Sequence, residues 1–131
     1  MSANYRIEDN PHKGNKGITR AIRAAVNSWN GLLFAYREES AFRQELFLAL
    51  ILIPITIFLP VTAVEKILMI SSVLAVLVVE LLNSSVEAAI DRISFEVHDL
   101  SKRAKDFGSA AVMVALLICA MTWGLILYQF I

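Results

Sequence analysis

Four polar side chains interrupt an apolar stretch of the sequence at a spacing that a helix would bring together. Glu80, Asn83, Glu87 and Asp91 occur within "VELLNSSVEAAIDR" (79–92), and the residues before this segment are almost all apolar. At about 100° per residue of an α-helix, the four positions fall within a sector of roughly 80°. A carboxylate inside hydrocarbon costs roughly 2.5–3.5 kcal/mol even on a lenient insertion scale, so this polar stripe should face protein, water or an ion.

Three kinds of chemistry fit such a stripe. Its carboxyl groups could form hydrogen-bonded contacts between helices, a proton or ion pathway, or part of a metal-assisted catalytic site. The surroundings favour the catalytic site. Glu38, Glu39 and Glu45 bracket the start of another apolar segment, and carboxylate oxygens from two helices are the ligands that Mg²⁺ prefers. The basic segment "HDLSKRAKDFGS" (98–109) follows the stripe and could meet phosphate charge.

The rest of the chain indicates a polytopic membrane protein. Of its 131 residues, 57% are hydrophobic, whereas ordinary globular chains reach about 45–50%. Residues 46–64 and 107–131 carry no charge, and residues 67–90 carry only two glutamates. Because a helix needs about 20 apolar residues to cross a bilayer, we expect an all-α membrane protein with three spans. These spans are expected at about 42–62, 66–91 and 107–130.

The first forty residues divide into two parts. "MSANYRIEDNPHKGNK" (1–16) lacks periodicity and is expected to be a flexible tail. In the segment at about 17–38, apolar residues gather on one side of a helix, and arginines and asparagines gather on the other. This pattern predicts an amphipathic helix on the membrane surface with its arginines near anionic headgroups. Residues 17–131 are expected to form a single membrane-embedded domain.

The distribution of basic residues predicts the orientation of the chain. Residues 1–45 contain seven Lys or Arg and residues 91–106 contain four, whereas residues 61–66 contain one. By the positive-inside rule, the N-terminus should be cytoplasmic and the C-terminus should lie outside. Acidic and basic residues balance at 12 each, so the net charge points to no nucleic-acid partner, and none is expected.

Phosphate binding in this chain would need a site of an unusual kind. The five glycines form neither the G-x-x-x-x-G-K-[ST] pattern nor the G-x-G-x-x-G pattern. A chain of 131 residues with three spans also has no room for a soluble nucleotide-binding domain. If the chain transfers phosphate, its site must therefore be built from helices alone.

Several segments, in the same order, resemble the small bacterial integral-membrane diacylglycerol kinases. The resemblance runs from about Gly17 to Trp123, and the block E-L-L-N-S-x-V-E-A-x-x-D is specific for this family. The segments that carry it are "TRAIRAA…SW" (19–29), "EESAFRQE" (38–45), "VVELLNSSVEAAIDR" (78–92) and "SKRAKDFGSAAV" (101–112). The resemblance implies a homotrimer of three-span protomers in the bacterial inner membrane. It also implies phosphorylation of 1,2-diacylglycerol to phosphatidate by ATP and Mg²⁺, with release of ADP.

The resemblance further implies roles for individual residues. Glu80 matches the general base for the lipid hydroxyl, and Glu39 and Glu87 match the glutamates that hold Mg²⁺ against the phosphates. Asn83 matches a polar neighbour of the base, and Asp91 looks like a supporting acid. The residues implied to contact ATP are Arg20, Asn27, Glu39, Glu87, Glu96, Val97, His98, Lys105 and Asp106. Those implied to contact or lie near the lipid substrate are Arg20, Gln44, Glu80 and Ser109.

The chain departs from the family pattern at the expected nucleotide rim. Asn27 and Val97 stand where tyrosine is expected, and Lys102 stands where glycine is expected, whereas the catalytic acids match. Two alternatives share the same acids. One is an undecaprenol kinase, and the other is a small oligomeric transporter or proton-conducting subunit that uses Glu80 and Glu87 as a relay. The full-length surface helix and third span favour the diacylglycerol form.

Overall fold

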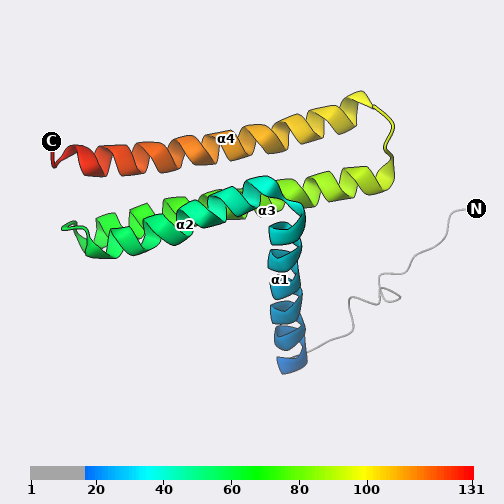
Figure 1. Cartoon of the computed structure of the whole chain (residues 1–131). Helices are drawn as coiled ribbons and strands as arrows, with labels where there is room; N and C mark the ends of the chain where they lie inside the picture. The colour runs from blue at the N-terminus through cyan, green and yellow to red at the C-terminus, as the bar shows by residue number, and fades with distance from the viewer. Residues whose placement is uncertain (1–16) are drawn as a thin grey trace, which may run out of the picture. The chain divides into compact units, whose positions relative to one another are not determined.

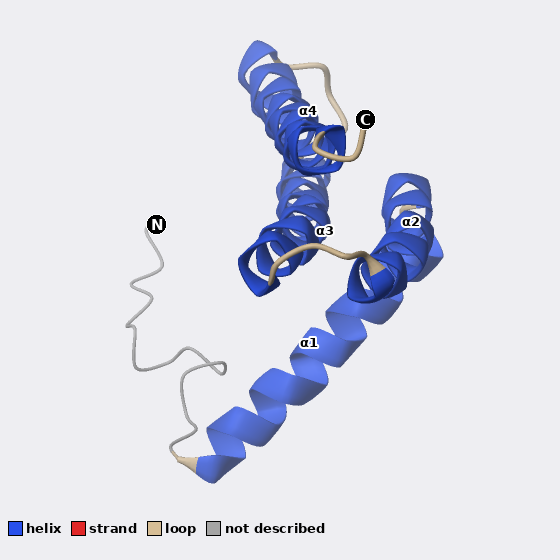
Figure 2. Ribbon diagram, turned by 90° about the vertical axis from the view of Figure 1, so that its left-hand side faces the viewer, coloured by secondary structure: helices blue, strands red, loops and turns tan. Residues whose placement is uncertain are grey.

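The computed structural model describes residues 17–131, and all of their regular secondary structure is helical (Figures 1 and 2). The expected all-α class is therefore confirmed. The tail expected at residues 1–16 lies outside the described part of the chain. The four helices are α1 (Ile18–Glu38), α2 (Ser40–Phe58), α3 (Ala63–Ile93) and α4 (Asp99–Tyr128).

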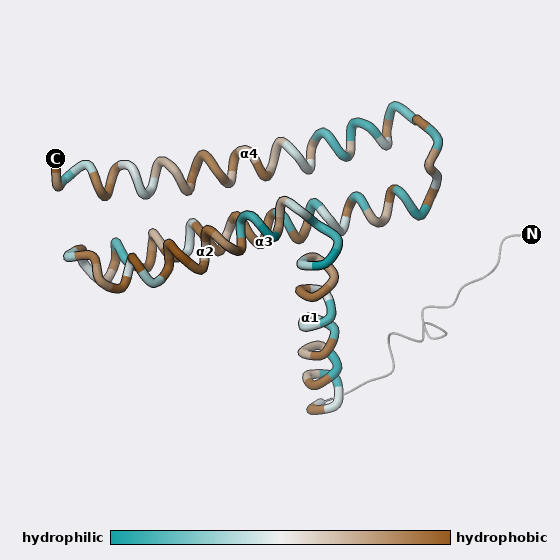
Figure 3. The backbone as a smooth tube through the Cα atoms, viewed as in Figure 1, coloured by the Kyte–Doolittle hydropathy of each residue, from teal (hydrophilic) through white to brown (hydrophobic). Residues whose placement is uncertain are grey.

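The chain divides between Phe34 and Ala35 into two units, which are described separately. The helix α1 begins in the first unit, and it covers the range predicted for the surface helix. Brown and teal segments alternate along α1 in Figure 3, as expected of an amphipathic helix. Its large apolar side chains are exposed; for example, Ile18 is 80% exposed and Trp29 is 63% exposed. An exposed apolar face of this kind suits a membrane surface. The single domain expected over residues 17–131 stays a prediction.

In the second unit, α2, α3 and α4 are each long and apolar enough to cross a membrane, which confirms the three predicted spans. The helix α3 contacts both α2 and α4. Both large and small side chains are buried in these helices, and the two alanines among them allow close approach of the helix backbones. The buried residues in the three helices include Phe42, Ala49 and Thr56 of α2, Met69, Val73 and Val76 of α3, and Ala115 of α4.

The turn between α2 and α3 comes earlier in the chain than the sequence analysis expected. Instead of continuing to about residue 62, α2 ends at Phe58, because the extended Leu59 precedes Pro60. A capping box then starts α3. The Thr62 hydroxyl accepts a hydrogen bond from the backbone N–H of Glu65 at 3.3 Å, and the Glu65 carboxylate accepts one from the backbone N–H of Thr62 at 2.7 Å.

The helices α3 and α4 both extend beyond their predicted spans at the end where they are joined. At this end, α3 continues to Ile93, and α4 begins at Asp99 instead of about residue 107. His98 caps α4 by accepting a hydrogen bond at Nδ1 from the N–H of Leu100, at 3.1 Å. The expected start was set by the last charged residue, but a polar helix can continue outside hydrocarbon. With 31 residues, α3 measures about 46 Å, against about 30 Å for a bilayer core.

Polar residues therefore gather where α3 ends and α4 begins, as the teal segments in Figure 3 show. The opposite ends of these helices are held by different contacts. The Trp123 indole N–H donates to the backbone oxygen of Met69 at 3.2 Å, and the Gln129 amide donates to the Glu65 carboxylate at 3.1 Å. These two contacts hold the last turns of α4 along the first turns of α3.

Candidate active site

The acidic residues expected to do chemistry lie around one buried carboxyl group. Glu80 of α3 is a buried residue, with only 4% of its surface exposed. Glu39 and Glu87 lie close enough to Glu80 for electrostatic repulsion between their carboxylates. Glu80 in turn lies close enough to repel Glu45 of α2. The structure therefore brings three predicted site residues together. We call Glu39, Glu45, Glu80 and Glu87 the acid cluster.

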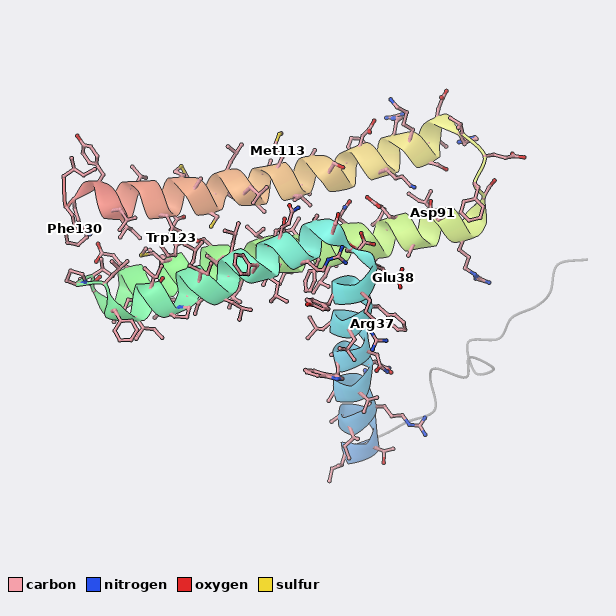
Figure 4. All side chains as sticks on the ribbon, viewed as in Figure 1. Arg37, Glu38, Asp91, Met113, Trp123 and Phe130 are labelled. Atoms are coloured by element: carbon pink, nitrogen blue, oxygen red, sulfur yellow. The ribbon has the colours of Figure 1, made fainter. Side chains whose placement is uncertain are left out.

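Glu39 joins the acid cluster because the chain breaks its helix there. It is the N-cap of α2, with an extended backbone (φ −102°, ψ 112°), and within the described chain its side chain makes no capping hydrogen bond. The corner is held by Arg43, whose Nη1 donates to the backbone oxygens of Tyr36 and Arg37, both at 3.0 Å. The neighbouring acid, Glu38, is exposed (labelled in Figure 4). Two adjacent glutamates thus have different surroundings.

The predicted stripe on α3 continues from Glu80 through one direct contact. The Asn83 Nδ2 donates a hydrogen bond to Glu87 Oε1 at 3.2 Å, as the i, i+4 spacing allows. Three buried side-chain atoms in the described part of the chain lack a hydrogen-bond partner: Asn83 Oδ1, Ser84 Oγ and Glu45 Oε2. Buried polar atoms are nearly always paired, so these oxygens mark a region with unused capacity to bind a polar group.

The last acid of the stripe pairs with a lysine of the neighbouring helix. Asp91, labelled in Figure 4, accepts a hydrogen bond at Oδ1 from Lys105 Nζ at 2.6 Å. This contact joins the end of α3 to the first turns of α4, which fits the supporting role expected for Asp91. Lys102 and Asp106 form a looser pair at 3.6 Å, and both of these side chains are well exposed.

A pocket of about 510 Å³ opens beside this ion pair. Its size falls within the 300–1,000 Å³ range of small-molecule sites. Five residues predicted to contact ATP line it together: Glu96, Val97, His98, Lys105 and Asp106. Phe95, Ser101 and Lys102 also line the pocket. The sequence analysis gave no individual role to Phe95 or Ser101, and it named Lys102 as a departure within the basic segment that could meet phosphate charge. Phe95 is 91% exposed and Val97 is 96% exposed, so the pocket combines charged groups with an apolar rim.

The remaining predicted residues are Arg20, Asn27, Gln44 and Ser109. Arg20 and Asn27 belong to the first unit. Gln44 of α2 and Ser109 of α4 are exposed. In residues 17–131, no group of three or more His, Cys, Asp or Glu is arranged to hold a metal ion by protein ligands alone. The roles expected for these residues stay predictions.

Three apolar helices, a buried glutamate with other acids near it and a charged pocket at one end characterise a membrane-embedded protein with a candidate active site. Comparison with known proteins gives the family. The profile of prokaryotic diacylglycerol kinase matches residues 26–127. The chain therefore belongs to the prokaryotic diacylglycerol kinase family, and it is a lipid kinase of a bacterial membrane.

Individual relatives match over most of their length. The diacylglycerol kinase of Haemophilus influenzae is 55% identical over 112 residues, which cover 86% of this chain and 95% of that protein. The diacylglycerol kinase of Escherichia coli K12 is 49% identical over 113 residues, covering 86% and 93%. That of Pseudomonas aeruginosa is 49% identical over 121 residues, covering 92% and 98%. A kinase of this family uses a nucleotide as co-substrate, which fits the charged pocket.

Proposed function

We propose that this enzyme phosphorylates 1,2-diacylglycerol to phosphatidate with ATP, releasing ADP. The observation that carries the proposal is Glu80, a buried carboxylate flanked by other acids in an apolar helix. A lipid alcohol can reach such a group from the bilayer, whereas a nucleotide must come from water. The nucleotide is proposed to bind in the charged pocket at the polar ends of α3 and α4.

In the proposed reaction, Glu80 acts as the general base. Its carboxylate accepts the proton of the lipid 3-hydroxyl as that oxygen forms a bond to the γ-phosphorus of ATP. The bond from this phosphorus to the bridging oxygen breaks, and ADP leaves with the bonding electrons. Phosphoryl transfer needs mainly positioning and charge compensation from the protein, and holding the two reactants together lowers the barrier further.

Glu39 and Glu87 are proposed to hold Mg²⁺. Their side chains supply the hard carboxylate oxygens that this ion prefers, and two protein ligands suffice where phosphate oxygens complete the shell. The unpartnered oxygen of Glu45 adds further capacity for a cation in the acid cluster. When bound, Mg²⁺ would neutralise charge on the phosphate oxygens. Asn83 would orient Glu87 through the 3.2 Å hydrogen bond.

ATP is proposed to enter the pocket between α3 and α4 with its phosphates toward Lys105. The exposed side chains of Phe95 and Val97 supply an apolar surface for the base, because aromatic and aliphatic groups pack on the faces of flat rings. Glu96, His98 and Asp106 are proposed as further contacts, with Arg20 and Asn27 contributed by the surface helix. Asp91 holds Lys105 at 2.6 Å and would keep its ammonium group near the phosphates.

The lipid is proposed to approach Glu80 past Gln44 and Ser109, with Arg20 near its polar end. The remaining proposals concern the arrangement in the bacterial inner membrane. The N-terminus would be cytoplasmic, where ATP is found, and the C-terminus would lie outside. Three copies would assemble into a homotrimer, as the family resemblance implies. Neighbouring copies would then complete the site, because one polar stripe and one pocket surround a nucleotide incompletely.

Purified protein in mixed micelles with Mg²⁺ and ATP labelled in the γ-phosphate tests this function. Either 1,2-diacylglycerol or undecaprenol is added as the acceptor. We expect label in phosphatidate. Label only in the polyprenyl phosphate would replace the proposal with an undecaprenol kinase. No label in either lipid, together with proton flux in liposomes, would replace it with a transporter or proton-conducting subunit.

The proposed nucleotide pocket makes a prediction about its two lysines. Lys105→Met should raise the KM for ATP at least about tenfold, because hydrogen bonds to charged groups contribute about 1.5–3 kcal/mol. Lys102→Met is the matched control, since Lys102 lines the same pocket but pairs only with the exposed Asp106. Lys102→Met should change the KM for ATP by less than about threefold, because exposed ion pairs contribute little free energy. Steady-state kinetics at saturating lipid would measure both, and equal effects would contradict the assignment of Lys105 to the phosphates.

A further inference from the structure

Gly108 of α4 lies against the polar stripe of α3 at a point where a side chain cannot fit. A Cβ added to this glycine would overlap Asn83 Oδ1 and would lie 3.1 Å from Asn83 Cγ. Both contacts are to the carboxamide and not to the backbone of α3. The close approach of α3 and α4 at Gly108 therefore depends on the absence of a side chain at this position.

The Asn83 carboxamide that faces Gly108 is also the group that contacts Glu87. Its Nδ2 donates to Glu87 Oε1 at 3.2 Å, and its Oδ1 is buried. A methyl group at position 108 would force the carboxamide to rotate or the helices to separate. The cheaper response is rotation, since the clash is with the end of a side chain, and rotation breaks the hydrogen bond to Glu87.

We infer that Gly108 is a positioning residue for the active site: its missing side chain lets Asn83 hold the Glu87 carboxylate. This inference rests on the proposed role of Glu87 in holding Mg²⁺. Gly108 contacts no reacting atom itself. Its effect passes through Asn83 to Glu87, and hence to the acid cluster around Glu80.

The structure offers a direct way to separate this role from a general effect on helix packing. The same added Cβ would lie 3.7 Å from Asn83 Cβ, which is ordinary van der Waals contact. Alanine at position 108 therefore fits once Asn83 is itself alanine. On the same helix, among residues 17–131, no atom comes within 4 Å of a Cβ added to Gly124. Gly124→Ala is thus a matched control with the same change in helix propensity.

The experiment compares the wild type with Gly108→Ala, Gly124→Ala, Asn83→Ala and the double variant Asn83→Ala/Gly108→Ala. Each is purified in detergent, and its kcat, its Mg²⁺ concentration for half-maximal activity and its thermal unfolding midpoint are measured. Gly108→Ala should lower kcat about 10- to 100-fold, the loss expected for a hydrogen bond to a charged group, and it should raise the Mg²⁺ requirement. Gly124→Ala should change neither quantity.

The double variant carries the decisive comparison. If Gly108 acts through Asn83, adding Gly108→Ala to Asn83→Ala should leave the Mg²⁺ requirement unchanged and should shift the unfolding midpoint no more than Gly124→Ala does in the wild type. The inference is overturned if Gly108→Ala is as active as Gly124→Ala. It is also overturned if Gly108→Ala lowers the unfolding midpoint equally with and without the Asn83 carboxamide, since the glycine would then serve packing alone. The effects of Gly108→Ala and Asn83→Ala on the unfolding midpoint could be non-additive while neither substitution changes the Mg²⁺ requirement. That result would support the contact between Gly108 and Asn83 and would reject the proposed role of Glu87.

Discussion

Replacing Glu80 by glutamine should abolish turnover and leave the helices intact. Glutamine has nearly the same shape as glutamate but cannot accept the proton of the lipid hydroxyl. Positioned general bases typically contribute about 10²–10⁴-fold to the rate, so we expect Glu80→Gln to lower kcat at least about 100-fold. Phosphatidate formation by the purified variant measures this loss. Because the substitution also removes a buried charge, the folded state should be no less stable.

Glu65→Gln is the matched control for this experiment. Glu65 lies on the same helix, but in the first turn of α3, where it contacts Thr62 and Gln129. This variant should keep wild-type turnover, and Glu80→Gln should keep its affinity for MgATP. Normal turnover by purified Glu80→Gln enzyme would exclude Glu80 as the base.

Replacing either proposed metal ligand should change the dependence on Mg²⁺ as well as the rate. Glu39→Gln and Glu87→Gln each remove one negative charge and one carboxylate oxygen from the acid cluster. Even residues that only orient metal ligands contribute about 10–100-fold to metal affinity. We therefore expect each variant to need at least about tenfold more Mg²⁺ for half-maximal activity. Activity measured across a Mg²⁺ titration at constant MgATP gives this quantity.

Glu38→Gln is the control that tests whether the higher Mg²⁺ requirement is specific to residues of the acid cluster. Glu38 precedes Glu39 directly, but its side chain is exposed (Figure 4). Its substitution should leave the Mg²⁺ requirement unchanged. The ligand roles would have to be abandoned if Glu39→Gln or Glu87→Gln showed the Mg²⁺ dependence of the wild type.

The main features of the fold could be predicted because the bilayer makes them visible in the sequence. Three apolar stretches and one amphipathic stretch correspond to the four helices. The errors lie at helix ends. The start of α4 was placed at the last charge, at about residue 107, although the helix begins at Asp99. Charge marks where hydrocarbon ends but not where hydrogen-bonded helix ends. The signature of Thr62 and Glu65 could have given the start of α3.

The candidate site was predictable where it depends on helical spacing. Glu80, Asn83, Glu87 and Asp91 share a face because of the helical repeat alone, and the Asn83–Glu87 contact follows from a spacing of four residues. The preference for Glu39 over Glu38 came from the resemblance and not from the pattern. The burial of Glu45 beside Glu80 was signalled only by its place in the same acidic segment.

Other features of the site depend on distances between elements, which a single sequence does not contain. Phe95 and Ser101 line the pocket because of the path of the connection between α3 and α4. The contact of Gly108 with Asn83 depends on the separation of α3 and α4 at one level. In the sequence, Gly108 was only one of several small residues that open the third span.

The most direct test of the division of roles within the acid cluster is binding of Mn²⁺, as a substitute for Mg²⁺, with a non-hydrolysable ATP analogue. Electron paramagnetic resonance of the purified enzyme would measure the bound ion in the wild type, Glu80→Gln and Glu87→Gln. We expect the wild type and Glu80→Gln to bind Mn²⁺ equally well and Glu87→Gln to bind it at least about tenfold more weakly. If Glu80→Gln instead failed to bind Mn²⁺ and Glu87→Gln bound it normally, the assignment of Glu80 as the base and Glu87 as the metal ligand would be contradicted.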